Sequence, residues 1–107
     1  MPDAAEPTLL LPDVVETSIA ALRRLADVAE AVEDEAQYVA DLVAVYEARL
    51  RGWLADPGSA EVHVAPRTAR AISLAIEEVG LVRDPHRAID WLSTFPQVVG
   101  LALGRRP

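Results

Sequence analysis

The sequence predicts an all-α protein in which a long amphipathic helix precedes a small bundle of three shorter helices. Between Pro12 and Pro57 there is no proline, and the only glycine is Gly52, so strong helix breakers are almost absent from this stretch. Apolar residues recur there at alternating steps of three and four, which is the heptad spacing of a helix with one packed face. Helix start signals at Pro66 and Asp84 indicate further helices in the second half.

Residues 1–12 are predicted to form an extended N-terminal arm, because Pro2, Pro7 and Pro12 disfavour a helix. Two alternatives remain for its only apolar part, residues 9–11. The three leucines could belong to a frayed terminus, or they could dock on a groove of this subunit or of a neighbour. The rest of the chain, residues 13–107, is then expected to form a single helical domain.

Residues 13–55 fit either one continuous helix or a helical hairpin that turns near residues 33–37. A start at Asp13 is expected, because aspartate is a good N-cap and Glu16 stands three residues later, as in a capping box. The acidic cluster at 33–35 favours the hairpin, because Glu30 and Asp34 are like charges four residues apart and weaken a helix there. The unbroken heptad register through the cluster, which contains no glycine, proline or asparagine, favours the continuous helix. We therefore expect the continuous helix.

A helix of this length, roughly 60 Å, could not bury its apolar stripe against the remainder of so small a chain. The sequence therefore predicts a homodimer or a higher homo-oligomer. The residues expected at the interface are Leu22, Leu25, Val32, Val39, Val43, Tyr46, Leu50 and Trp53.

Residues 56–65 are predicted to be a linker, beginning with the turn-forming segment 56–59. Polar and apolar residues alternate over 61–64, as in a short strand, but no partner strand is apparent in the chain. We expect an extended segment there, with an intersubunit strand as the alternative.

Residues 66–104 are predicted to form the short-helix bundle. The first helix should start at Pro66 and end at Gly80, and the second should start with Asp84 as its N-cap. Thr94 could cap a separate last helix, which Gly104 would end.

Charge divides the chain into two halves. The net charge is −7, and residues 1–47 hold eleven acids but only two arginines, whereas residues 48–107 hold eight arginines and six acids. An acidic first half argues against nucleic acid as its ligand, because phosphate contacts supply most of that affinity. It would suit a basic protein partner, or the arginine-richer half of a second subunit.

Residues suited to catalysis or metal binding are sparse. The chain has no cysteine, and its two histidines, His63 and His86, do not form a metal-binding pair. His86 and Asp90 could share a helix face, but the sequence offers no further ligands. No nucleophile motif or glycine-rich phosphate loop is present. The expectation is a protein without enzymatic activity, cofactor or metal. The N-terminus lacks the basic region of a signal peptide and no stretch is long enough to span a membrane, so a cytoplasmic location is expected.

The pattern as a whole predicts a non-catalytic, oligomerising protein-interaction module, such as an adaptor, an assembly subunit or an inhibitor. It would use the heptad stripe and an acidic face. The alternative is a small transcriptional regulator or antitoxin-like protein whose C-terminal helices contact DNA. The residues for that contact would be Arg67, Arg70, Arg83 and Arg87.

Overall fold

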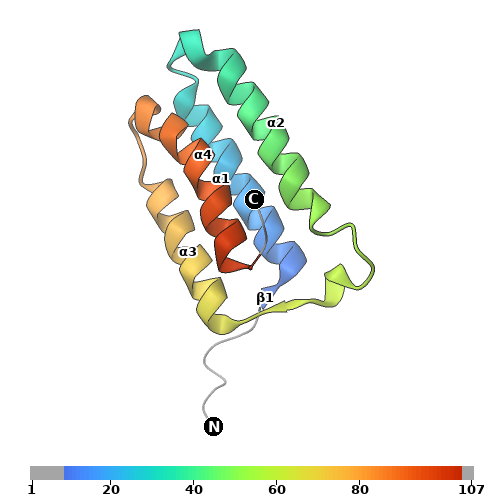
Figure 1. Cartoon of the computed structure of the whole chain (residues 1–107). Helices are drawn as coiled ribbons and strands as arrows, with labels where there is room; N and C mark the ends of the chain where they lie inside the picture. The colour runs from blue at the N-terminus through green and yellow to red at the C-terminus, as the bar shows by residue number, and fades with distance from the viewer. Residues whose placement is uncertain (1–8, 105–107) are drawn as a thin grey trace.

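The computed structural model describes residues 9–104, which form a bundle of four α-helices (Figure 1). The helices are α1 (Leu11–Ala29), α2 (Ala36–Gly52), α3 (Pro66–Gly80) and α4 (Pro85–Ala102). Between them lie two 3₁₀ turns, η2 (Glu33–Glu35) and η3 (Ser59–Glu61), and a two-stranded sheet, β1 (Leu9–Leu10) with β2 (His63–Val64). The all-α prediction is confirmed.

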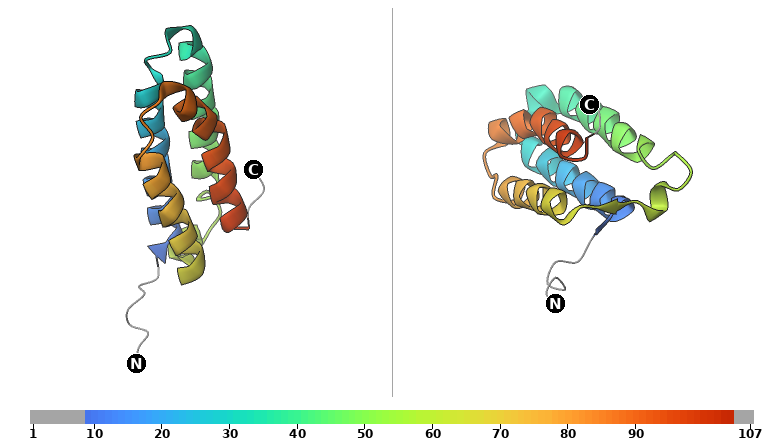
Figure 2. Two further views of the ribbon diagram at one scale, coloured as in Figure 1. Left: turned by 90° about the vertical axis from the view of Figure 1, so that its left-hand side faces the viewer. Right: turned by 60° about the horizontal axis from the view of Figure 1, so that its bottom comes forward.

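Helix α1 lies at the centre of the bundle and contacts the other three helices, most extensively α4. Helices α2 and α3 lie on opposite sides of the α1–α4 pair (Figure 2). This position follows from the sequence of α1, whose apolar face is wide enough to meet several neighbours. Its buried residues are Leu11, Val14, Val15, Ser18, Ile19, Ala21, Leu22, Leu25 and Ala29.

The first half of the chain is a helical hairpin, so the preference for one continuous helix is wrong. Helix α1 ends at Ala29, and the chain turns through backbone hydrogen bonds from the amide of Val32 to the carbonyl of Ala29 and from Glu35 to Val32. Folding back lets α2 bury part of its apolar stripe on α1 and α4 within the same chain. The like charges at the turn also weaken a helix there, as expected.

The N-terminal leucines dock on their own chain. Leu9 and Leu10 pair antiparallel with Val64 and His63, so the predicted extended segment is a strand whose partner lies within the subunit. Helix α1 then starts at Leu11 with no side-chain cap, because Pro12 falls in the first turn, where its missing amide is tolerated. The predicted N-cap at Asp13 is therefore wrong. Residues 1–8 of the predicted arm lie outside the described residues.

The C-terminal half has two helices rather than the three expected. Asp84 caps α4 as predicted, since its Oδ1 accepts a hydrogen bond from the amide of His86 at 2.9 Å. Helix α4 does not stop at Thr94, whose hydroxyl bonds to the carbonyl of Asp90 as in a helix interior. It continues through Pro96, because the continuous helix places Phe95 and Val99 in the core.

One buried polar group in α1 predicts a stabilising substitution. Ser18 is completely buried, and its Oγ has no hydrogen-bond partner among the residues that the structure describes. A buried hydroxyl without a partner destabilises the fold by about 1–3 kcal/mol. We expect Ser18→Ala to raise the free energy of unfolding, by up to about 1 kcal/mol after the small void is counted. Urea unfolding measures this, and a loss of stability would contradict it.

Candidate protein-interaction groove

The residues predicted to form an oligomer interface lie mostly inside the subunit. Leu22, Leu25 and Leu50 are at most 1% exposed and Val39 is 6% exposed, all within the bundle core. The other four are partly buried or pack against that core: Val32, Val43, Tyr46 and Trp53. Helix α2 therefore packs much of its stripe against its own chain.

This placement predicts that Leu22 determines subunit stability. Replacing a fully buried leucine by alanine removes about 2–5 kcal/mol of folding free energy, so we expect Leu22→Ala to lower the unfolding free energy by that amount. Leu101, which is 74% exposed on α4, is the matched control, and Leu101→Ala should change stability by less than about 0.5 kcal/mol. Urea unfolding at low protein concentration compares the two variants. Equal effects would contradict the burial described.

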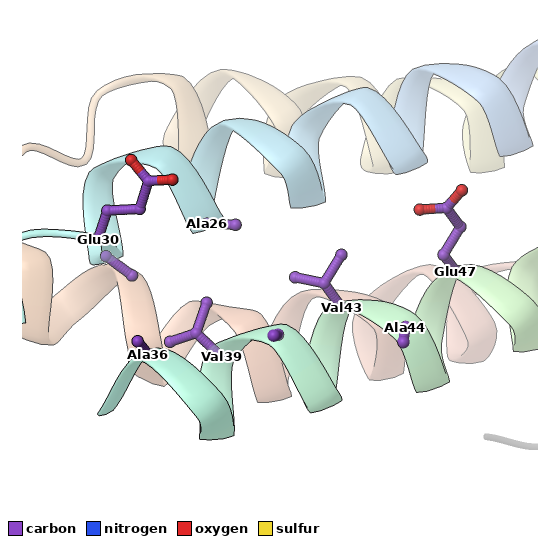
Figure 3. A pocket seen from close by; sticks show the side chains of 9 residues that line it. Ala26, Glu30, Ala36, Val39, Val43, Ala44 and Glu47 are labelled. Atoms are coloured by element: carbon purple, nitrogen blue, oxygen red, sulfur yellow. The ribbon is translucent and has the colours of Figure 1, made fainter. Parts of the chain in front are cut away.

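An open apolar groove runs between α1 and α2 near the turn. It encloses about 500 Å³. Val39 and Val43 point into it from α2 and Ala26 faces them from α1 (Figure 3). The full lining is Ala26, Ala29, Glu30, Ala36, Val39, Ala40, Val43, Ala44 and Glu47. Of the residues predicted for an interface, Val39 and Val43 are the two that line this groove.

Small side chains create the groove. Ala36, Ala40 and Ala44 are spaced four residues apart, so they share one face of α2. They stand opposite Ala26 and Ala29 of α1, and side chains this small leave the space between the helices unfilled. Ala29 and Ala36 belong to the predicted heptad stripe, but they were not among the residues expected at the interface. Sequence reasoning missed Ala26, Ala40 and Ala44, although the regular alanine spacing was a visible signal. A row of alanines on one helix face predicts close packing of a neighbouring helix as readily as it predicts a groove.

An ion-pair network closes the end of the groove away from the turn. Glu47 Oε1 accepts hydrogen bonds from Arg23 Nη2 of α1 at 2.7 Å and from Arg51 Nε at 3.4 Å. Arg51 Nη1 also donates to Glu16 Oε2 at 2.8 Å, which joins the two helices a second time. Two arginines and two glutamates balance one another, so this end of the groove is electrically neutral.

The end at the turn is acidic. Glu30 lines the groove there, and Glu33, Asp34 and Glu35 form the adjoining turn η2. All four are exposed, and none forms an ion pair with another described residue. The groove thus has an apolar floor, a neutral end and an end with uncompensated negative charge.

The ion-pair network predicts a pH dependence of stability. The hydrogen bond from Arg23, with its positive charge, lowers the pKa of Glu47 below its usual range, although desolvation opposes this shift. Because the folded pKa lies below the unfolded value of about 4.3, the charged Glu47 stabilises the fold at pH 7. That stabilisation is lost as the pH falls through the lowered pKa.

We therefore expect Glu47→Gln to destabilise the protein modestly at pH 7 and by less at pH 3. Urea unfolding at both pH values measures the two differences. Glu61→Gln is the control, because Glu61 is exposed and has no ion pair among the described residues. An equal loss at both pH values for Glu47→Gln would contradict the assigned role of its charge.

The other candidate residues lie outside the lining of the groove. Within residues 9–104 no group of three histidine, aspartate or glutamate side chains could hold a metal ion. The four candidate arginines lie on α3, on α4 and in the connection between them. Arg83 there donates to the carbonyls of Gly80 and Val82. No helix in the described part of the chain is both long and apolar enough to cross a membrane.

Comparisons of the chain with protein-family models, with curated proteins and with solved structures gave no match.

Proposed function

We propose that the protein is a non-catalytic, oligomerising interaction module whose α1–α2 groove binds an amphipathic helix of a basic protein partner. The observation behind this proposal is an apolar groove of about 500 Å³ whose turn end has four carboxylates without ion pairs to other described residues. An adaptor, an assembly subunit and an inhibitor would all use such a surface. The groove offers no nucleophile, and its two carboxylates, Glu30 and Glu47, lie at opposite ends (Figure 3).

The dimensions of the groove favour a helix as the ligand. Its alanine row from Ala36 to Ala44 covers nine residues, and the eight helical steps between the two ends correspond to about 12 Å of helix. A partner helix laid along the groove would present two or three large apolar side chains over that length, at spacings of three and four residues. Those side chains would contact Val39, Val43 and the alanines, and would remove this apolar surface from water.

The charges favour a basic partner and one orientation. Arginines or lysines near the turn would lie close to Glu30 and to the acids of η2, while the neutral end at Glu47 gives no such attraction. Charge complementarity of this kind mainly speeds association and selects the partner. Since the turn is exposed, added salt should weaken the attraction.

The test uses two synthetic helical peptides labelled with a fluorophore. Both carry leucines at positions i, i+4, i+7 and i+11; one has arginines at its polar positions, the other glutamates. We expect fluorescence anisotropy to show binding of the arginine peptide alone, and weaker binding as salt is raised. Ala44→Phe, which fills the groove, should weaken binding by about tenfold or more.

Two further variants make the test specific. Ala48 is exposed on the same helix and lies outside the groove lining, so Ala48→Phe should leave the affinity unchanged. Glu30→Gln should weaken binding and reduce its salt dependence. Equal binding of both peptides, or equal effects of Ala44→Phe and Ala48→Phe, would overturn the proposal.

A further inference from the structure

We propose that two copies of the chain exchange halves at the turn: the surface of α2, α3 and α4 that holds α1 accepts α1, together with β1, of a second copy. In the exchanged form residues 30–35 become helical, and α1 and α2 join into one long helix. This inference goes beyond the proposed function and does not depend on what the groove binds.

Residues 30–35, which form the turn between α1 and α2, contain no residue type or backbone angle that excludes a helix. Residues 30–35 include no glycine or proline, and within residues 9–104 the only left-handed backbone angles are at Gly58 and Gly104. Glu30 and Ala36, on either side, already have helical angles, and η2 is itself a 3₁₀ helix. The larger departure is at Val32, where ψ is 85°, and Glu35 departs less, with φ at −104° and ψ at 6°. A continuous helix needs both residues to move to helical angles, with ψ at about −42°.

The apolar register continues through the turn. Leu25, Ala29, Val32, Ala36 and Val39 keep heptad spacing, so a straightened helix would present the apolar residues of α1 and α2 along one side. Two such helices could pack antiparallel, with α2 of each copy on α1 of the other. This arrangement is symmetric, so it closes as a dimer and leaves no surface for further growth.

The ion pairs fix where the symmetry axis would lie. Arg23 pairs with Glu47, and Glu16 pairs with Arg51. Both pairs are centred in sequence on the segment 33–35. The same pairs formed between two antiparallel copies would therefore place the axis at η2, where the acids of the two chains meet. Their repulsion opposes exchange and favours the hairpin.

Helices α3 and α4 move with α2 in this exchange, because residues 53–62 are too few to run back along a straightened helix of about 60 Å. Exchange keeps the contacts of α1 with α2, α3 and α4 and the pairing of β1 with β2, now formed between chains. The balance between hairpin and exchanged dimer thus depends on the turn and on protein concentration, and little on the core.

Chemical cross-linking distinguishes exchange from any other kind of dimer. The natural chain has no cysteine, so Arg23→Cys with Glu47→Cys supplies one defined pair, to be joined by a short bis-maleimide. In the hairpin the link stays within one chain. In the exchanged dimer it joins two chains, which then run as a dimer on a denaturing gel. The control pair, Arg23→Cys with Asp27→Cys, lies within α1 and should link within one chain in either form.

Two turn variants set the direction of the equilibrium. Asp34→Asn with Glu35→Gln removes charge at the axis and should raise the dimer fraction several-fold, as measured by light scattering over a range of concentrations. Insertion of two glycines after Asp34 should abolish the cross-link between chains, because it prevents a continuous helix. The proposal is overturned if the charge-reduced variant stays monomeric at every concentration. It is equally overturned if dimers form but the links between positions 23 and 47 remain within single chains.

Discussion

Burial of the apolar face of α1 is the interaction on which the rest of the structure depends. This helix supplies nine buried residues and contacts each of the other three helices. Its first residue, Leu11, is buried next to the small sheet. The amide of Leu11 donates a hydrogen bond to the carbonyl of Val62 at 2.8 Å, which ties the start of α1 to the connection after α2. The central helix thus joins the N-terminal strand, the connection after α2 and the C-terminal pair of helices in one core.

The groove between α1 and α2 follows from which side chains the two helices place at their contact. Helix α4 contacts α1 most extensively, α2 comes next and α3 last, so α2 shares the surface of α1 with both other helices. Near the turn the contact of α2 with α1 is formed by alanines on both helices, which leave space that valines only partly fill. The ion pairs of Glu47 hold the other end, where Leu50 is buried. Tight packing at one end and open packing at the other follow from side-chain size along α2.

The sequence predicted the helical class and most helix positions, because heptad spacing and proline positions are local signals. It could not predict the direction of the chain after Ala29, since a hairpin and a straight helix share the same register. The strand partner of His63 and Val64 was missed because the pairing joins residues more than fifty positions apart. The separate last helix after Thr94 was predicted wrongly for a similar reason: burial of Phe95 and Val99 is a tertiary effect that local capping signals do not include.

Only part of the candidate groove could be predicted from the sequence, because the groove also depends on contacts between residues far apart in the chain. Val39 and Val43 were expected at an interface from their spacing, whereas the alanines and Glu30 gain meaning only when α1 lies beside α2. The acids of the turn then have two consequences in the proposals made above. They attract a basic helix to the groove, and they repel one another at the axis of an exchanged dimer. A bound basic helix would offset that repulsion, so binding and exchange would be linked, and each would favour the other by the same free energy.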